Sequence, residues 1–81
     1  MATYRYTIFD ADPDQSGPCE WPGMTDVEIK AESAAVAAEI ALMVACTEAQ
    51  MLPTEYFATD KLWVLVTDED HCTHKFSREV G

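Results

Sequence analysis

Three aspartates at alternate positions form the segment whose residue types most suggest metal binding. Asp10, Asp12 and Asp14 match the first, third and fifth oxygen donors of a calcium-binding loop. The match then ends, because an EF-hand loop needs glycine at its sixth position and glutamate at its twelfth, where this chain has Gln15 and Trp21. A solvated acidic loop is the favoured interpretation, and calcium binding by this loop is kept as an alternative.

His71, Cys72 and His74 form a second group of metal-ligand types. Structural zinc sites use about four ligands, usually in spaced pairs, and the remaining cysteines, Cys19 and Cys46, are expected on a loop and in a helix. If the last segment is a strand, Cys72 and His74 share a face and His71 does not. We expect His71 to be a turn residue, Cys46 and Cys72 to be small buried hydrophobic residues, and no metal to bind.

The sequence contains no motif of an enzyme. Nucleophilic catalysis needs a base near a serine or cysteine, and no such arrangement surrounds the two histidines. The chain has no P-loop and no glycine-rich dinucleotide-binding motif. Glu39 lies within an apolar run, which could raise its pKa if it were buried, but the helical pattern places it on the solvent side. We expect a non-enzymatic protein without a cofactor.

Charge is the strongest signal in the sequence. Fifteen Asp and Glu residues stand against five Lys and Arg residues, and the formal net charge is −10. This exceeds the magnitude of about 2–8 that is typical of a small domain. Such a chain repels nucleic acids and anionic membranes and attracts basic protein surfaces. We therefore expect a basic protein partner, with no direct binding of nucleic acid or membrane.

The acidic residues gather in segments that contain no base. Six of them lie between residues 10 and 28, and three more are consecutive at 68–70. In an extended chain, carboxylates two residues apart are separated by about 6.6 Å, roughly two nucleotide steps along a DNA strand. Such a row can present a phosphate-like potential to arginine and lysine. The candidate partner-binding residues are Asp10, Asp12, Asp14, Glu20, Asp26, Glu28, Asp68, Glu69 and Asp70.

The sequence carries no signal for export. The N-terminus lacks the basic and apolar regions of a signal peptide. The longest apolar stretch, residues 34–46, is shorter than the ~20 residues that a membrane-spanning helix needs. Three scattered cysteines argue against a disulfide framework. We expect a cytoplasmic location, in the host cell if the gene is viral.

Periodicity and turn residues predict one domain over residues 1–81, with the element order β-β-α-β-β. Short alternating runs predict four strands, and an alanine-rich run after the N-cap residue Ser33 predicts one helix. Proline and glycine predict a long loop between the first two strands. The expected elements are strands at 4–9 and 26–32, a loop at 10–23, a helix at 34–50, and strands at 61–67 and 72–78.

This order predicts an α+β fold with one helix packed on a mainly antiparallel four-stranded sheet. The first strand is expected between the second and third, with simple hairpin order as the alternative. An apolar stripe at helical spacing should face the sheet, so replacing Ile40 by aspartate is expected to abolish folding. The expected stripe is Val36, Ile40, Met43, Val44 and Thr47.

The sheet face away from the helix also carries large apolar residues. Alternation places Phe9, Trp63 and Leu65 there, and one helix covers only one face of a sheet. We expect the long loop with Trp21, a second copy of the chain or a partner to cover them. Trp21, Trp63 and Leu65 are therefore candidates for an apolar interface, and a homodimer is compatible with this interpretation.

Four segments carry a resemblance to a known class of proteins. They are the DADPD loop at 10–14, the DVEIKAES strand at 26–33, the alanine-rich AAVAAEIALMVA helix at 34–45 and the TDEDH turn at 67–71. In size, charge and layout the chain resembles the small acidic nucleic-acid mimics that phages encode, many anti-CRISPR proteins among them. The resemblance implies a non-enzymatic inhibitor that occupies the DNA- or RNA-binding groove of a host complex. It assigns no role to an individual residue.

We therefore expect an acidic binding protein that imitates nucleic acid and inhibits a basic nucleic-acid-binding complex. Two alternatives remain open. In the first, the chain is a small structural or interaction domain whose acidic surface serves solubility or halophilic adaptation. In the second, the loop from Asp10 to Asp14 binds calcium.

Overall fold

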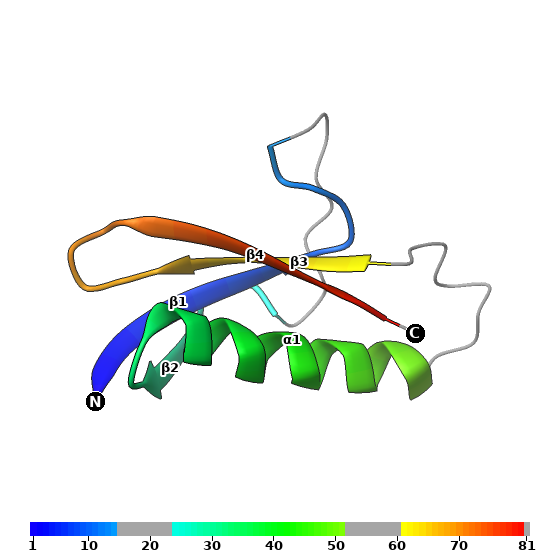
Figure 1. Cartoon of the computed structure of the whole chain (residues 1–81), viewed down its shortest axis with the longest axis horizontal. Helices are drawn as coiled ribbons and strands as arrows, with labels where there is room; N and C mark the ends of the chain where they lie inside the picture. Colours follow the sequence, from blue (N-terminus) through cyan, green and yellow to red (C-terminus); the bar gives the residue numbers. More distant parts are fainter. Residues whose placement is uncertain (15–23, 52–60, 81) are drawn as a thin grey trace.

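Four strands and one helix make up the described chain, in the predicted order β-β-α-β-β (Figure 1). The structure is a computed structural model, and it describes residues 1–14, 24–51 and 61–80. The long loop predicted at 10–23 lies mostly outside these residues. The elements are β1 (Ala2–Phe9), β2 (Val27–Ala31), α1 (Ala34–Met51), β3 (Lys61–Thr67) and β4 (Thr73–Glu79).

All three strand pairs are antiparallel, and β1 and β3 are the central strands. The order across the sheet is β2-β1-β3-β4, which confirms the expected place of the first strand and excludes hairpin order. Tyr4 pairs with Ile29 of β2, and Ile8 pairs with Val64 of β3. Because side chains alternate along a strand, this register places these four residues on one face. That face is the one covered by α1 (Figure 1).

Ser33 begins α1, as the sequence predicts. Its Oγ accepts a hydrogen bond from the backbone N–H of Val36 at 3.2 Å, and its carbonyl accepts one from Ala37 at 3.0 Å. A serine at this position satisfies an amide that has no partner within the helix. The alanine-rich run then continues to Met51, one residue beyond the predicted end.

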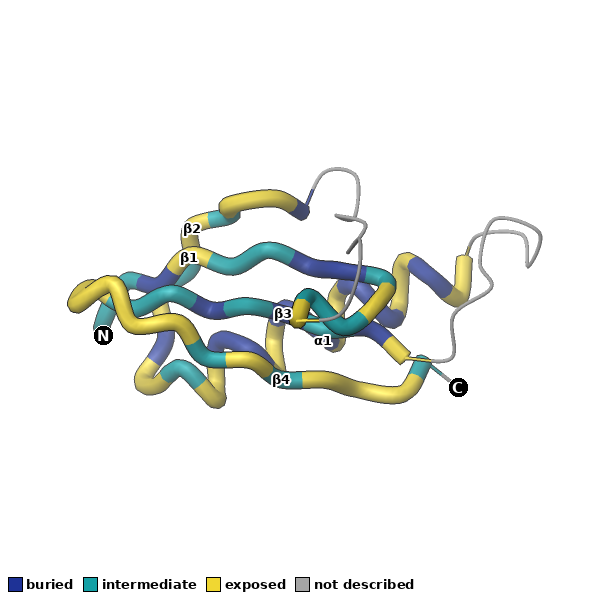
Figure 2. The backbone as a smooth tube through the Cα atoms, turned by 90° about the horizontal axis from the view of Figure 1, so that it is seen from above, coloured by how far each residue is buried: buried dark blue, intermediate teal, exposed yellow. Residues whose placement is uncertain are grey.

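The core lies between the sheet and the alanine-rich side of α1. The sheet supplies the large enclosed side chains, among which Ile8, Leu62, Val64 and Val66 are fully buried. Figure 2 shows buried positions along the central strands and along one side of the helix. The helix contributes mainly small residues to this core: Ala37, Ala38, Ala41, Leu42, Ala45, Cys46 and Ala49.

The predicted buried stripe of α1 is wrong, because its residues face away from the sheet. Val36, Ile40, Met43 and Val44 have exposed fractions between 36% and 50%, and Thr47 is also exposed. The helix is apolar around much of its circumference, so helical spacing alone does not identify the side that packs. The alanine side fits closely against the large side chains of the sheet, and the bulkier residues remain outside.

α1 is also long and apolar enough to meet the criteria for a membrane-spanning helix. These criteria concern length and composition alone, and the core helices of globular proteins meet them as well. In this fold 39% of α1 is buried inside the protein. The helix therefore has a packing role that accounts for part of its apolar composition.

Adjacent substitutions on α1 test which side of the helix faces the sheet. Ile40→Asp places a carboxylate at a position that is 38% exposed, so the protein should fold and lose about 1 kcal/mol or less of unfolding free energy, through helix propensity. Ala41→Asp places the same group at a position that is 1% exposed. There an unpaired charge costs several kcal/mol, comparable with the ~5 kcal/mol total stability of a marginal domain.

Urea unfolding followed by circular dichroism measures both variants. We expect a cooperative transition for Ile40→Asp and an unfolded chain for Ala41→Asp. The opposite pattern would show that the helix packs through the side that was first predicted.

Candidate functional site

The outer face of the sheet, away from α1, carries the residues predicted as an apolar interface. Phe9 is buried, and Trp63 and Leu65 are half-buried. The ammonium groups of Lys61 and Lys75 each lie 5.3 Å from the centre of the Trp63 ring, within the range of a cation–π interaction. These lysines cover part of the Trp63 surface and give it a cationic rather than a purely apolar border.

Lys75 also connects the acidic loop after β1 to the outer face. Its Nζ lies 3.0 Å from Asp12 Oδ1 and also contacts Asp14 Oδ2. The pKa of Asp12 is lowered, mainly by the hydrogen bond from the backbone N–H of Asp14 and next by the one from Lys75. The pKa of Lys75 is raised, mainly by its hydrogen bond to Asp14 and next by the one to Asp12. The ammonium thus takes the position between the two carboxylates that the calcium hypothesis assigns to a metal ion. Over residues 1–14, 24–51 and 61–80, no group of three His, Cys, Asp or Glu side chains is placed to hold a metal.

Arg5 and Asp26 form a second ion pair on the outer face. Arg5 Nε and Nη2 donate to the two carboxylate oxygens at 2.7 and 3.1 Å, and Glu28 lies 4.0 Å from Nη1. The hydrogen bond from Arg5 lowers the pKa of Asp26. Asp26 has a φ of 52°, in the left-handed region, and its N–H donates to Thr7 Oγ1 at 2.9 Å. Both charged side chains are more than half exposed, so the pair orients Asp26 and contributes little stability.

Residues 68–71, which we call the hairpin tip, lie in the turn that connects β3 to β4. The N–H of His71 donates to the Asp68 carbonyl at 3.1 Å, and His71 has a φ of 65°, which confirms its predicted place in a turn. Asp68 Oδ1 accepts hydrogen bonds from the backbone N–H groups of Asp70 and Cys72, both at 2.9 Å. An aspartate side chain that binds the backbone two residues ahead forms an Asx turn. The Asp68 side chain therefore fixes the shape of the hairpin tip.

Contacts with the sheet orient two carboxylates of the hairpin tip. His74 Nε2 lies 3.1 Å from Asp68 Oδ2, and this contact, together with backbone N–H groups of the turn, lowers the pKa of Asp68. Glu69 Oε1 accepts a hydrogen bond from the backbone N–H of Thr3 in β1 at 2.9 Å. The third carboxylate, Asp70, is exposed. The tip thus presents three consecutive acidic side chains, two of them held in place.

The two described cysteines differ in environment, which corrects one prediction. Cys46 is buried in the core as expected, whereas Cys72 is exposed, because β4 begins only at Thr73. Burial raises the pKa of the Cys46 thiol. A buried thiol with a raised pKa acts as a packing group and not as a nucleophile.

The lysine and arginine residues are unevenly distributed over the described chain, whereas carboxylates are about equally numerous on the outer face and around α1 and the hairpin tip. Strand alternation places Arg5, Lys30, Lys61 and Lys75 on the outer face, since the residues beside them in sequence pack into the core. Around α1 and at the hairpin tip, the described chain has one cation, Arg78. The carboxylates on the outer face are Asp12, Asp14, Asp26, Glu28 and Glu79, and those around α1 and at the hairpin tip are Glu32, Glu39, Glu48, Asp68, Glu69 and Asp70. Asp10 directly follows β1, beyond the alternation of the strand, and is assigned to neither set.

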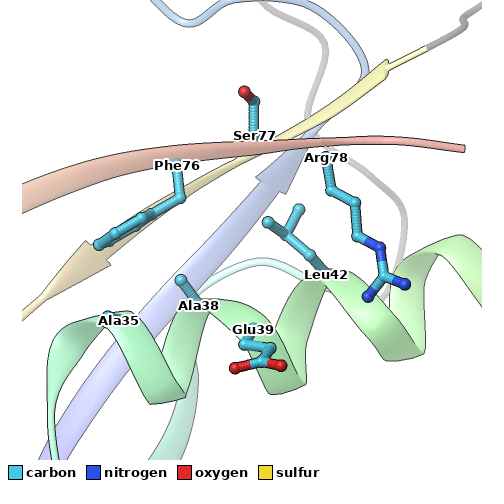
Figure 3. A pocket seen from close by; sticks show the side chains of 7 residues that line it. All are labelled: Ala35, Ala38, Glu39, Leu42, Phe76, Ser77 and Arg78. Atoms are coloured by element: carbon cyan, nitrogen blue, oxygen red, sulfur yellow. The ribbon is translucent and has the colours of Figure 1, made fainter.

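A groove of about 330 Å³ lies between α1 and the edge strand β4 (Figure 3). Small and apolar side chains line most of it, and Glu39 and Arg78 add opposite charges. The sequence does not predict this groove, because its lining depends on the side of α1 that faces the sheet. The lining residues are Ala35, Ala38, Glu39, Leu42, Phe76, Ser77 and Arg78.

The predicted partner-binding carboxylates fall into separate groups. One group surrounds Lys75, a second lies at Arg5, and the third forms the hairpin tip. The first two groups each contact a cation, whereas the third contacts backbone amides and a histidine. Asp10 directly follows β1 and is half-buried, and Glu20 and Trp21 lie outside the described residues. Among these three groups, the carboxylates of the hairpin tip therefore have the least compensated charge.

The lowered pKa of Asp68 makes stability depend on pH in the acid range. Its pKa in the unfolded chain is about 3.9, and the folded-state pKa is lower. The stabilisation by the ionised Asp68 side chain is therefore complete above the unfolded-state pKa and is lost as the pH falls through the folded-state pKa. Asparagine at position 68 keeps the Oδ1 acceptor but cannot titrate. Asp68→Asn should therefore be less stable than the wild type at pH 7, and its stability should fall less between about pH 4 and pH 2.

Urea midpoints measured over this pH range test the assignment. Asp70→Asn, in the same turn, is the matched control and should keep the pH dependence of the wild type. Identical pH profiles for the wild type and Asp68→Asn would contradict the role given to Asp68.

Comparisons with known proteins assign no family to this chain. No family model matches its sequence, and no curated protein and no solved structure matches it. The function must therefore be argued from the geometry and the charge of the chain itself.

Proposed function

We propose that this protein is a non-enzymatic binding protein whose acidic hairpin tip contacts a basic surface of a nucleic-acid-binding protein. The observation that carries the proposal is the uneven division of charge. Four of the five cations lie on the outer face of the sheet, and no lysine or arginine of the described chain contacts a carboxylate of the hairpin tip. With a net charge of −10, the uncompensated part of the surface attracts cations.

The geometry of the hairpin tip favours binding because two of its carboxylates are already oriented. Asp68 is held by the turn and by His74, and Glu69 is held by the backbone of β1. Side chains that are fixed before binding lose less conformational entropy when a partner docks. Three consecutive carboxylates on a defined turn thus form a compact anionic surface for arginine and lysine side chains.

A basic groove that normally holds DNA or RNA is the partner that fits this surface best. Such a groove is lined by arginine and lysine, and its association with an anionic surface is fast at low salt and weakens as salt screens the charges. Occupation of the groove excludes nucleic acid. The protein would then act as an inhibitor of the anti-CRISPR kind, in the cytoplasm of a host cell.

Matched charge reversals test the proposal. Glu69→Lys with Asp70→Lys reverses the charge of two exposed carboxylates of the hairpin tip, and Glu28→Lys with Glu79→Lys makes the same change of net charge on the outer face. Each exposed pair is worth ~0.2–1 kcal/mol. Two lost attractions and two new repulsions should therefore weaken binding by the first variant about fourfold or more. The second should bind nearly as the wild type does.

The measurement is capture of nucleic-acid-binding proteins from a lysate on the immobilised protein, with identification by mass spectrometry. Binding should fall between about 50 mM and about 500 mM NaCl, and added DNA or RNA should displace the captured proteins. An equal loss of binding in both double variants would show that the contact does not lie at the hairpin tip. Recovery of no basic nucleic-acid-binding protein at low salt would overturn the proposed function.

A further inference from the structure

The side of α1 that faces away from the sheet carries a continuous apolar stripe. Its apolar members have exposed fractions from 36% to 80%, and on an ideal helix the stripe spans only about 100° of the circumference. The described chain places no element beyond this side of the helix (Figure 1). An exposed strip of this kind marks an interaction surface. We define the outer stripe as Val36, Ile40, Met43, Val44, Thr47 and Met51.

The spacing of the outer stripe is the same from either end. The intervals between its successive members are four, three, one, three and four residues. Two copies of α1 laid antiparallel about a two-fold axis therefore place each member opposite a member of the other copy, as a self-complementary interface requires. The opposed pairs are Val36 with the partner's Met51, Ile40 with the partner's Thr47, and Met43 with the partner's Val44.

Thr47 is the polar member of the outer stripe, and its hydroxyl is already satisfied. Thr47 Oγ1 donates to the Met43 carbonyl at 2.8 Å. Burying a hydroxyl costs free energy mainly when its hydrogen bond to water is not replaced. Thr47 can therefore enter an apolar interface and contribute its methyl group.

The acidic residues beside the outer stripe do not meet in this arrangement. Glu39 and Glu48 lie about 90° to either side of its centre, and both are exposed. In the antiparallel pair, Glu39 is level with the partner's Glu48, but the two lie on opposite edges of the interface. On the same edge, each glutamate is about 13 Å along the axis from the same residue of the other copy. This distance exceeds the Debye length of about 8 Å at physiological salt, so neither glutamate prevents the pairing.

From the stripe, its symmetric spacing and its flanking charges, we infer that the outer stripe is the interface of a weak homodimer in which two α1 helices pack antiparallel. The helix is about 27 Å long, and a single helix face of this length gives an interface at the small end of the size range for specific complexes. The net charge of −10 on each copy adds long-range repulsion. The dimer should therefore be weak and should become tighter as salt rises.

This inference is independent of the proposed function. The outer stripe lies on the far side of α1, whereas the hairpin tip contacts β1 and β4. A dimer through α1 leaves the hairpin tips of both copies free. The two interactions also respond to salt in opposite directions, because one is apolar between like-charged copies and the other joins opposite charges.

Sedimentation of the full chain tests the inference. From about 10 µM to about 1 mM protein, the range in which weak complexes dissociate, we expect a monomer–dimer equilibrium. The dimer fraction should increase when NaCl rises from about 50 mM to about 500 mM, since the Debye length then shortens from about 14 Å to about 4 Å. A protein that stays monomeric at 1 mM in 500 mM NaCl would overturn the inference and leave the outer stripe to a different protein.

A matched pair of variants separates the interface from a general effect of charge. Ile40→Glu with Met43→Glu should abolish the dimer and keep the circular dichroism spectrum of the wild type. Thr73→Glu with Ser77→Glu adds the same charge at exposed positions of β4 and should retain the dimer. Equal dimerisation of the first variant and the wild type would place the interface elsewhere.

Disulfide trapping tests the antiparallel geometry. In a chain with Cys19→Ser and Cys72→Ser, the remaining Cys46 is buried. Met43→Cys then places two thiols close to the two-fold axis, whereas Val36→Cys places them about 22 Å apart along the axis, far beyond the reach of a disulfide. Under a mild oxidant, Met43→Cys should form a covalent dimer and Val36→Cys should not. Equal cross-linking of the two chains would contradict the antiparallel arrangement.

Discussion

The contact between the alanine side of α1 and the branched side chains of β1 and β3 determines the rest of the structure. Alanine adds little volume and loses no side-chain entropy on burial, so the sheet must provide most of the core. Ile8, Leu62, Val64 and Val66 meet this need from two adjacent strands. Because the helix packs through its small residues, its larger apolar residues remain outside, and the domain has one thin core and one exposed apolar surface.

This packing also explains the division of charge. The helix covers one face of the sheet, so the charged residues at alternate strand positions gather on the other face. There Arg5 and Lys75 pair with carboxylates of the segments that follow β1 and precede β2. The outer face is consequently close to electrical balance, and the negative excess of the described chain remains around α1 and at the hairpin tip. Strand alternation thus separates the cations of the strands from the carboxylates around α1 and at the hairpin tip.

The sequence predicts the elements well and the packing side of the helix poorly, for physical reasons. β3 has the predicted bounds and Ser33 is the predicted cap, because alternation, capping and turn residues act over short distances. The order of the strands in the sheet depends on contacts between distant segments, so the sequence leaves hairpin order open as an alternative to the observed order. The packing side of α1 depends on how closely the helix approaches the sheet, and apolar residues around most of a helix give no direction. The sequence also predicts Cys72 as the first residue of the last strand, whereas β4 begins one residue later, at Thr73.

The same reasoning explains which parts of the site could be foreseen. The acidic side chains at 68–70 are visible in the sequence, but their contacts with Thr3 and His74 depend on the pairing of β3 with β1 and β4. Likewise, the lysines beside Trp63 are brought together only by the register of β3 and β4. Helical spacing identifies most residues of the outer stripe, but the structure shows that they face away from the sheet instead of packing against it. A regular apolar pattern shows that residues share a surface, and only the packing decides whether that surface is inside one chain or between two.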